Sequence, residues 1–356
     1  MPMNFDQYLA DLESRIDDRT ERALEKQWED FADGKAGGVF VPRRPRANPS
    51  GIEWPSMTIH EAIGSPERMA LSQYRIASDQ LARGGGELLA IRANYGSGIM
   101  ACALGAEPYF MPEDILELPI SRALPGGTAD IRRMIARGIP AFDTGYAAQV
   151  FRVAEIFRDV AGRYPMIAAH VHIYEPDIQG PLDAAELLWG GGMYTAFYDE
   201  PELVKDALAF VTDAIVAFRK KWDALCPPYS EKYNVEWGWL HRGGCMIRED
   251  SMMNLSGEFY REFVMPQDQR LLTALGGGAI HFCGRGDHYI EHAARLTGLS
   301  AVNLSQPAYN DMRRIYAHTI EKNIQLLALA PEEAAAAMRA GRDLSGKVFC
   351  VERPSV

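Results

Sequence analysis

One stretch, residues 276–311, constrains the fold more than any other part of the chain. It contains two short apolar runs, Ala279–Cys283 and Ala301–Leu304, and each ends abruptly in polar and turn-forming residues. An amphipathic helical pattern lies between them, so the stretch predicts two parallel strands joined by a helix. In such units the polar residues at the carboxyl ends of the strands gather at one edge of the sheet. We therefore expect the chemistry of this chain at that edge.

Strand-like and helix-like segments alternate from residue 85 onward. This alternation is typical of a parallel sheet wound with crossover helices. Strands are expected at residues 88–94, 108–115, 166–174, 244–247, 279–283, 301–304, 324–329 and 348–351, and helices at 182–191 and 201–225. Eight strands with intervening helices predict an α/β fold, specifically a (β/α)8 TIM-type barrel over residues 85–356.

Residues 1–84 predict a helical extension in front of the barrel. An apolar stripe amid charged residues indicates a helix within residues 1–35, and it consists of Phe5, Tyr8, Leu9, Leu12 and Ile16. Gly, Pro and Arg dominate residues 37–55, which predicts a loop, and helical spacing returns over 58–83. Such a helix packs on the barrel or on a second subunit, so we expect that any oligomer forms through it.

Composition narrows the partners and the compartment. The chain has 37 Lys and Arg against 48 Asp and Glu, a net charge of −11. This charge argues against nucleic-acid and membrane partners and leaves a small-molecule substrate. There is no signal segment and no run of about 18 apolar residues, so we expect a cytoplasmic protein. The five cysteines are scattered and odd in number, which favours reduced thiols or metal ligands over disulfides.

The first expected site feature is a His-x-Cys pair. His281 and Cys283 alternate around Phe282, so both side chains leave one face of the strand and could hold one metal ion. Catalytic zinc sites use three protein ligands of this kind and keep one position open. Cys350 is the only later cysteine and lies on the last expected strand. The pair alone is also compatible with a hydrogen-bonded histidine beside a small buried cysteine.

Two other interpretations of the same loop remain open. Cys283 and His288 could act as a nucleophile and its base, although nothing in the sequence indicates an oxyanion hole. The glycines of Gly284–Gly286 suggest a phosphate loop, but the spacing of the known phosphate-binding motifs is missing.

Polar residues at the other strand exits complete the expected mouth of the barrel. They are Tyr95, Asp177, Gln179, Arg248, Asp250, Asn303 and Gln306, with Asn254 just beyond the fourth strand. The alternative is that residues in these loops cap helices, as Asp183, Ser256 and Asp287 are placed to do.

Four segments resemble the uroporphyrinogen decarboxylase superfamily. They are Gly180–Gly190, Tyr198–Val204, Asp250–Pro266 and Ile280–Gly284. The resemblance implies a (β/α)8 barrel. It also implies one of two activities, because the superfamily includes porphyrinogen decarboxylases and zinc-dependent methyltransferases that move methyl groups between corrinoid proteins and thiols.

The residues are closer to the methyltransferase branch. The decarboxylases carry an Arg-Gln-Ala-Gly-Arg-Tyr motif, of which the corresponding exit here keeps only Arg92. The methyltransferases use His-x-Cys and a distant Cys as zinc ligands, and His281, Cys283 and Cys350 follow that order. The last family cysteine normally lies in a Gly-Cys loop, whereas Cys350 reads as mid-strand, so a carboxylate is an alternative third ligand: Glu249, Asp250 or Glu352.

These observations together predict a zinc-dependent methyl (alkyl) transferase acting between a corrinoid or other methyl donor and a thiol acceptor. The expected catalytic residues are Asp250, Asp177 and Arg248, the expected metal ligands are His281, Cys283 and Cys350, and the expected substrate-binding residues are Tyr95, Gln179, Asn254, Asn303, Gln306 and Arg92. A corrinoid-carrying partner protein would dock over the mouth. The alternatives are a cofactor-free decarboxylase, in which Arg92 and Arg248 hold carboxylates, and a non-catalytic accessory protein of the same fold.

Overall fold

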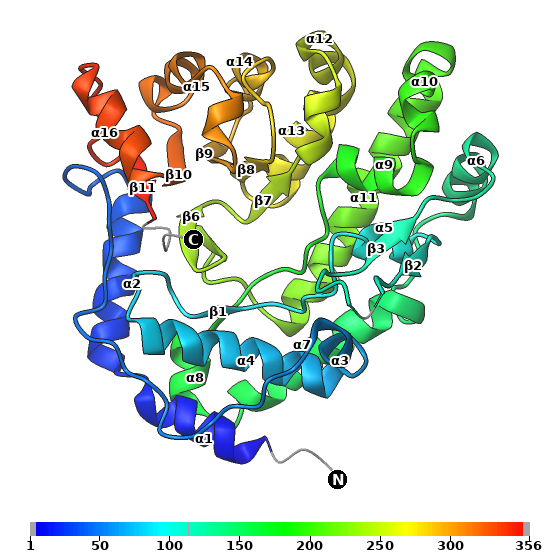
Figure 1. Cartoon of the computed structure of the whole chain (residues 1–356). Coiled ribbons are helices and arrows are strands. Elements are labelled where there is room, and N and C mark those ends of the chain that lie inside the picture. The colour runs from blue at the N-terminus through cyan, green and yellow to red at the C-terminus, as the bar shows by residue number, and fades with distance from the viewer. Residues whose placement is uncertain (1–4, 113, 352–356) are drawn as a thin grey trace.

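The main sheet of the protein has five parallel strands. The computed structural model describes residues 5–112 and 114–351, and in it the strands lie in the order β11-β10-β9-β8-β7 (Figure 1). They are β7 (Cys245–Arg248), β8 (Gly278–Phe282), β9 (Leu299–Leu304), β10 (Gln325–Leu329) and β11 (Val348–Cys350). The last five sequence-predicted strands are therefore confirmed, because each is a short buried apolar run with a clear turn before it.

Sheet register places polar residues side by side at one edge. Arg248 of β7 is opposite His281 of β8, and His281 is opposite Asn303 of β9. All three lie at or near the carboxyl ends of their strands and all three are buried. The register therefore gathers residues that are 33 and 22 positions apart in sequence into one row.

The predicted barrel is not closed in this structure. Strands β1 (Ala90–Ile91) and β4 (His172–Ile173) pair in parallel with each other in a separate two-stranded sheet. On the other side, Phe40 forms a parallel bridge to Phe349 of β11, so a residue of the N-terminal segment extends the main sheet. The described strands thus form an α/β arrangement with parallel sheets rather than a complete eight-stranded barrel.

Two of the expected strands differ from the prediction. In residues 108–115 the structure has the short strand β2 (Glu107–Tyr109), which pairs antiparallel with β3 (Ile120–Arg122) and lies outside the main sheet. Alternation alone does not distinguish a parallel strand from an edge ribbon, and proline in the run favours the edge. In residues 166–174 most of the segment is the helix α8 (Pro165–His170), which begins with proline at its first position and precedes β4.

A hairpin that the sequence did not predict lies against one face of the main sheet. Strands β5 (Tyr233–Glu236) and β6 (Trp239–Arg242) are joined by Trp237 and Gly238, whose φ angles are +52° and +83°. Positive φ at both central residues is the type I′ turn, but Trp-Gly lacks the Asn-Gly signal that usually announces it. Strand β6 contacts β8 and β9 on the side of the sheet away from α13 and α15 (Figure 1).

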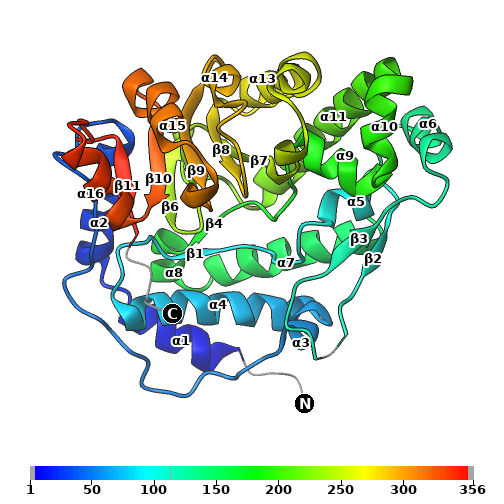
Figure 2. The ribbon, with the colours of Figure 1, turned by 45° about the horizontal axis from the view of Figure 1, so that its top comes forward.

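Helices cover the outer face of the sheet and the base of the molecule (Figure 2). The helix predicted within residues 1–35 is two helices, because Asp17 breaks it and caps the second through the N–H of Thr20. The α-helices are α1 (Asp6–Arg15), α2 (Asp18–Ala32), α3 (Ile59–Ile63), α4 (Pro66–Arg83), α5 (Ile99–Ala103), α6 (Thr128–Arg137), α7 (Gly145–Ala161), α8, α9 (Pro181–Trp189), α10 (Gly192–Asp199), α11 (Pro201–Leu225), α12 (Gly257–Phe259), α13 (Met265–Ala274), α14 (Ile290–Ala293), α15 (Met312–His318) and α16 (Pro331–Arg339).

The N-terminal segment packs against the rest of the chain. Helix α1 contacts α4 and α8, and α2 contacts β6. A buried ion pair joins Glu21 of α2 to Arg44 at 2.7 Å, and Arg44 also donates to the carbonyl groups of Gly85 and Glu87, just before β1. Within the described residues, no helix combines the length and the apolar character needed to cross a lipid bilayer.

The buried apolar residues form two clusters, one on each face of the main sheet. The helix-side cluster lies between the sheet and the helices and includes Ile280, Phe282, Val348 and Cys350. The hairpin-side cluster lies on the other face and includes Leu240, Ala279, Leu327 and Phe349. Because side chains alternate along a strand, His281 leaves β8 on the same face as Ala279, toward the hairpin, and Cys283 continues that alternation just beyond the strand.

Candidate metal centre

Three potential metal ligands meet at the carboxyl ends of β7 and β8. One ligand atom each from Asp250, His281 and Cys283 lies within 4.8 Å of the others. The Sγ of Cys283 is 3.5 Å from Nε2 of His281, and that nitrogen is 3.6 Å from Oδ1 of Asp250. In the part of the chain that the structure describes, this is the one group of three or more such residues.

Hydrogen bonds to neighbouring strand exits hold two of these side chains in place. Asp250 opens a 3-10 turn (Asp250–Asn254) directly after β7, and its Oδ1 accepts the backbone N–H of Cys283 at 2.6 Å. The thiol of Cys283 donates to Oγ of Ser305 at 3.4 Å. The exits of β7, β8 and β9 are thus tied together at the cluster.

The environment of His281 leaves one ring nitrogen available. Its Nδ1 is 2.6 Å from Oδ1 of Asn303, and the Nδ2 of Asn303 donates to the carbonyl of Leu327 at 2.7 Å. Since the Leu327 carbonyl can only accept, the amide orientation of Asn303 is fixed and its oxygen accepts a hydrogen bond from the Nδ1–H of His281. The lone pair of His281 is then on Nε2, which faces Cys283 and Asp250. Hydrogen bonding of the second ring nitrogen is the usual arrangement of a metal-binding histidine.

Burial sets the protonation states of the cluster without a metal. It lowers the pKa of His281, and this outweighs the opposing effect of the Asp250 charge, so the imidazole is neutral. Burial also raises the pKa of the Cys283 thiol, against a smaller opposing effect of its hydrogen bond to Ser305. A neutral imidazole is ready to bind a metal, whereas the thiol must lose its proton when it binds.

A buried charge network lies next to the cluster. Arg248 forms an ion pair with Glu236 at 2.8 Å and lies 3.5 Å from Asp177, and Arg92 lies 3.6 Å from the other oxygen of Asp177. Burial works to raise the pKa of Asp177, but Arg248 and Arg92 outweigh it and lower the pKa. The Nη1 of Arg92 and the Nε of Arg248 are buried without a hydrogen-bond partner.

Trp237 connects the cluster to this network and was not predicted. Its ring centroid is 5.1 Å from that of His281 and 5.2 Å from the guanidinium of Arg248. The residue sits at the turn of the β5–β6 hairpin in a left-handed conformation, which is strained for tryptophan. Nothing in the sequence indicated that Trp237 would contact His281 and Arg248, because the turn that carries it was not predicted.

The structure does not bring Cys350 to the cluster. Phe349 belongs to the hairpin-side cluster, so the next residue, Cys350, turns to the opposite face and belongs to the helix-side cluster, near α16. The mid-strand position that made this cysteine doubtful therefore turns its side chain the wrong way. Of the alternative carboxylates, Asp250 lies in the cluster, Glu249 is fully buried beside Asp268, and Glu352 lies outside the described residues.

The other predicted residues have varied surroundings. Gln179 donates to Asp177 at 2.5 Å, and Gln306 accepts the N–H of Gly284, next to Cys283, at 2.5 Å. Asn254 donates to the hydroxyl of Tyr194 at 3.0 Å. Tyr95 is fully buried and packs on Tyr146, with 5.5 Å between ring centroids.

The capping interpretation holds for some of the loop residues. Ser256 does cap α12, accepting the N–H of Phe259. Asp183 does not cap its own helix but reaches across to the turn that carries Asp250.

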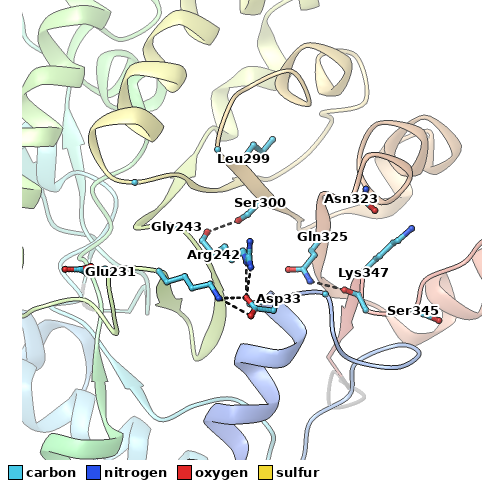
Figure 3. Close-up of a pocket in the computed structure, with 16 residues that line it drawn as sticks. Asp33, Glu231, Arg242, Gly243, Leu299, Ser300, Asn323, Gln325, Ser345 and Lys347 are labelled. Carbon is cyan, nitrogen blue, oxygen red and sulfur yellow. Dashed lines mark hydrogen bonds and ion pairs between the residues drawn. The ribbon is translucent and has the colours of Figure 1, made fainter.

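A large cavity of about 850 Å³ lies at the opposite, amino-terminal end of the sheet (Figure 3). Three of its charged residues pair with one another: Asp33 lies 2.8 Å from Lys232 and 2.8 Å from Arg242, and it accepts a hydrogen bond from the hydroxyl of Tyr233. Gln325 donates to the carbonyl groups of Phe31 and Gly346. This end has volume but lacks the potential ligand atoms that converge at the carboxyl end.

Comparison with known proteins supports the fold. The structure resembles a methyltransferase from Methanosarcina mazei, with a TM-score of 0.60 over 86% of this chain and 82% of that chain and a sequence identity of 15%. The sequence matches no protein-family model, and no curated protein matches it. At this identity the likeness establishes a shared fold and leaves the chemistry to be argued from the residues.

Proposed function

We propose that this protein is a zinc-dependent methyltransferase that alkylates a thiol. The observation that carries the proposal is the cluster of Asp250, His281 and Cys283, whose ligand atoms converge while Asn303 holds the other ring nitrogen of His281. The fold shared with a methyltransferase supports the same reaction class.

The donor set fits zinc. Thiolate, imidazole and carboxylate are the ligands of catalytic zinc sites, which bind three protein side chains and keep a fourth position open. When bound, zinc would lower the pKa of a thiol at that open position so that a thiolate forms at neutral pH. Asp250, His281 and Cys283 would hold the ion, with Asp250 in the place that the sequence analysis gave to Cys350.

The neighbouring residues would bind and orient the substrate. The buried Nη1 of Arg92 and Nε of Arg248 make no hydrogen bond, and each faces a carboxylate oxygen of Asp177 at the longer distance of 3.6 and 3.5 Å. A polar or anionic group on the substrate would satisfy these donors, which is a strong orienting interaction in a buried site. The methyl donor would be a corrinoid, and a corrinoid-carrying protein would dock over the carboxyl end of the sheet.

Metal analysis of the purified protein tests the proposal first. We expect about one zinc per chain, by analogy with catalytic zinc sites. The zinc-loaded protein is then mixed with methylcobalamin and a series of small thiols, and demethylation of the corrinoid is followed by absorbance. Demethylation should require both zinc and thiol. A protein that folds fully and binds no zinc at micromolar concentrations would contradict the proposal.

A cofactor-free decarboxylase is the second candidate. The buried N–H groups of Arg92 and Arg248 that make no hydrogen bond favour it, because they would also bind substrate carboxylates in competition with Asp177. Removal of the metal with a chelator distinguishes the two functions. A decarboxylase would keep its turnover of a porphyrinogen after treatment with a chelator, whereas the proposed methyltransferase would lose its activity and regain it with zinc.

A further inference from the structure

The start of helix α9 is hydrogen-bonded to the segment after β7 that carries Asp250. The helix begins in the segment Gly180–Gly190, one of the motifs that the sequence analysis singled out without giving it a role. The N–H of Gly180 donates to the carbonyl of Arg248 at 2.8 Å. A Cβ at position 180 would lie 2.6 Å from that carbonyl oxygen, so only glycine allows this approach.

Asp183 makes a second set of hydrogen bonds between α9 and this segment. Its two carboxylate oxygens accept the backbone N–H groups of Asp250 and Ser251 at 2.7 and 2.8 Å. Asp183 is 3% exposed, so water does not compete for these bonds. The side chain therefore fixes two consecutive peptide groups of the turn from a helix 67 positions earlier in the sequence.

The turn that Asp183 holds is the one that presents Asp250 to the cluster. The Oδ1 of Asp250 accepts the N–H of Cys283 at 2.6 Å and lies 3.6 Å from Nε2 of His281. A shift of the turn would move this carboxylate relative to both other ligands. Loss of an outer hydrogen-bonding partner typically weakens metal binding by about 10- to 100-fold.

We propose that Asp183 is a positioning residue for the metal centre: by holding the 250–251 turn, it sets the metal affinity and the ligand geometry of Asp250, His281 and Cys283. The proposal rests on the proposed function, since it requires that the cluster bind a metal. A purely structural role is the alternative, in which Asp183 stabilises the fold and leaves the metal affinity unchanged.

The chain offers a matched control. Glu13 also accepts two consecutive backbone N–H groups, those of Met166 and Ile167, both at 2.8 Å, at the start of α8. Glu13→Gln and Asp183→Asn are therefore the same chemical change to the same kind of contact, and only Asp183 is connected to the cluster. Asp183→Ser is a second variant, which removes both carboxylate oxygens and leaves a small polar side chain.

The experiment measures zinc and cobalt binding to metal-free protein. Zinc affinity is measured by competition with a chromophoric chelator, ligand geometry by the visible absorption of the cobalt-loaded protein, and folding by thermal unfolding without metal. Asp183→Asn should bind zinc about 10- to 100-fold more weakly and give a changed cobalt spectrum, and Asp183→Ser should show the same direction. Glu13→Gln should keep wild-type affinity and spectrum whatever its unfolding temperature.

Four outcomes are decisive. Weaker zinc binding and an altered cobalt spectrum in folded Asp183 variants, with Glu13→Gln unchanged, support the proposal. Wild-type affinity and spectrum in folded Asp183→Asn overturn it and leave the proposed function intact. Failure of both Asp183 variants to fold also overturns it, because Asp183 would then serve the fold. Absence of zinc binding by the wild-type protein removes the proposed function itself, which is a separate result.

Discussion

The two ends of the five-stranded sheet are both polar, but their charged groups are arranged in opposite ways. At the amino-terminal end, Asp33 lies within 2.8 Å of Lys35, Lys232 and Arg242, so these four charges have their partners inside the protein. At the carboxyl end, Nδ1 of His281 and the thiol of Cys283 bond outward to Asn303 and Ser305, while Nε2 and Sγ converge with a carboxylate oxygen of Asp250. The cavity of about 850 Å³ lies at the end with these paired charges.

This difference shows which property identifies a site. A hollow that is lined by paired charges has little to gain from a ligand, because any new contact must replace an existing one. Ligand atoms that converge on one point can all gain a contact at once when a metal ion binds between them. The predictions below test this contrast by perturbing each end and measuring metal binding and stability separately.

The largest effect is expected at Cys283. Cys283→Ala removes a ligand atom, and because loss of a mere outer partner already costs about 10- to 100-fold in metal affinity, loss of the ligand should cost on the order of a hundredfold or more. The fold should persist, since the site lies on a preformed sheet. Competition with a chelator measures the affinity and circular dichroism the fold. Unchanged zinc affinity in the folded variant would remove Cys283 from the metal centre.

The next effect is expected at Asn303. Asn303→Ala frees the Nδ1 of His281 and so loosens its orientation, which should weaken zinc binding by about 10- to 100-fold. Asn303→Asp is the informative partner variant, because its carboxylate can still accept from Nδ1 but cannot donate to the carbonyl of Leu327. We expect Asn303→Asp to bind zinc more tightly than Asn303→Ala. Equal affinities of all three proteins would show that Asn303 does not orient His281.

The strands that bear the site could be predicted because each has a clear local pattern in the sequence. Residues 279–283 and 301–304 are short buried runs with abrupt polar ends, and the period of two puts His281 and Cys283 on one face. The same rule turns Cys350 away from them, because Phe349 packs on the hairpin side of the sheet and the next residue takes the opposite face. The sequence analysis placed Cys350 by chain order within a family pattern, and chain order does not determine the face.

Other features of the structure could not be predicted, because no short sequence pattern indicates them. The contact between Asp183 and the 250–251 turn joins residues 67 positions apart, and a lone Asp at the start of a helix reads as a cap. The β5–β6 hairpin turns at Trp237 and Gly238, where the residue types give no hint of a type I′ turn. Closure of the barrel was expected from the number of alternating segments, but the segment counted as the second strand belongs to an antiparallel ribbon.

At the amino-terminal end, Asp33→Asn should lower stability and leave metal binding unchanged. Burial works to raise the pKa of Asp33, but Lys232, Lys35 and Arg242 outweigh it and hold the pKa far below its ordinary value of 3.8. Because the cations are about half exposed or more, we expect a loss of only about 1 to 2 kcal/mol for the whole network at pH 7.

The pH dependence of this variant has a definite sign. A carboxyl group with a lowered pKa in the folded protein contributes its full stability above its unfolded pKa, near 4, and loses it as the pH falls toward the folded value. The difference in free energy of unfolding between wild type and Asp33→Asn should therefore be constant from about pH 5 to 7 and shrink below about pH 4. Urea unfolding at several pH values measures it. A difference that grows on acidification would show that these ion pairs do not act as described.

The smallest effect is expected at Cys350, which tests the assignment of faces. Its side chain is 2% exposed and packs in the helix-side cluster, so Cys350→Ala removes one buried sulfur and should cost about 1 kcal/mol of stability. Zinc affinity should equal that of the wild type, in contrast to Cys283→Ala, which is the same chemical change two residues beyond His281. Matched zinc titrations of the two alanine variants make this comparison directly. If Cys350→Ala lost zinc as Cys283→Ala does, the thiol of Cys350 would have to reach the carboxyl end of the sheet in solution. Asp250 would then no longer be the third ligand, and the contrast between the two faces of β11 would fail.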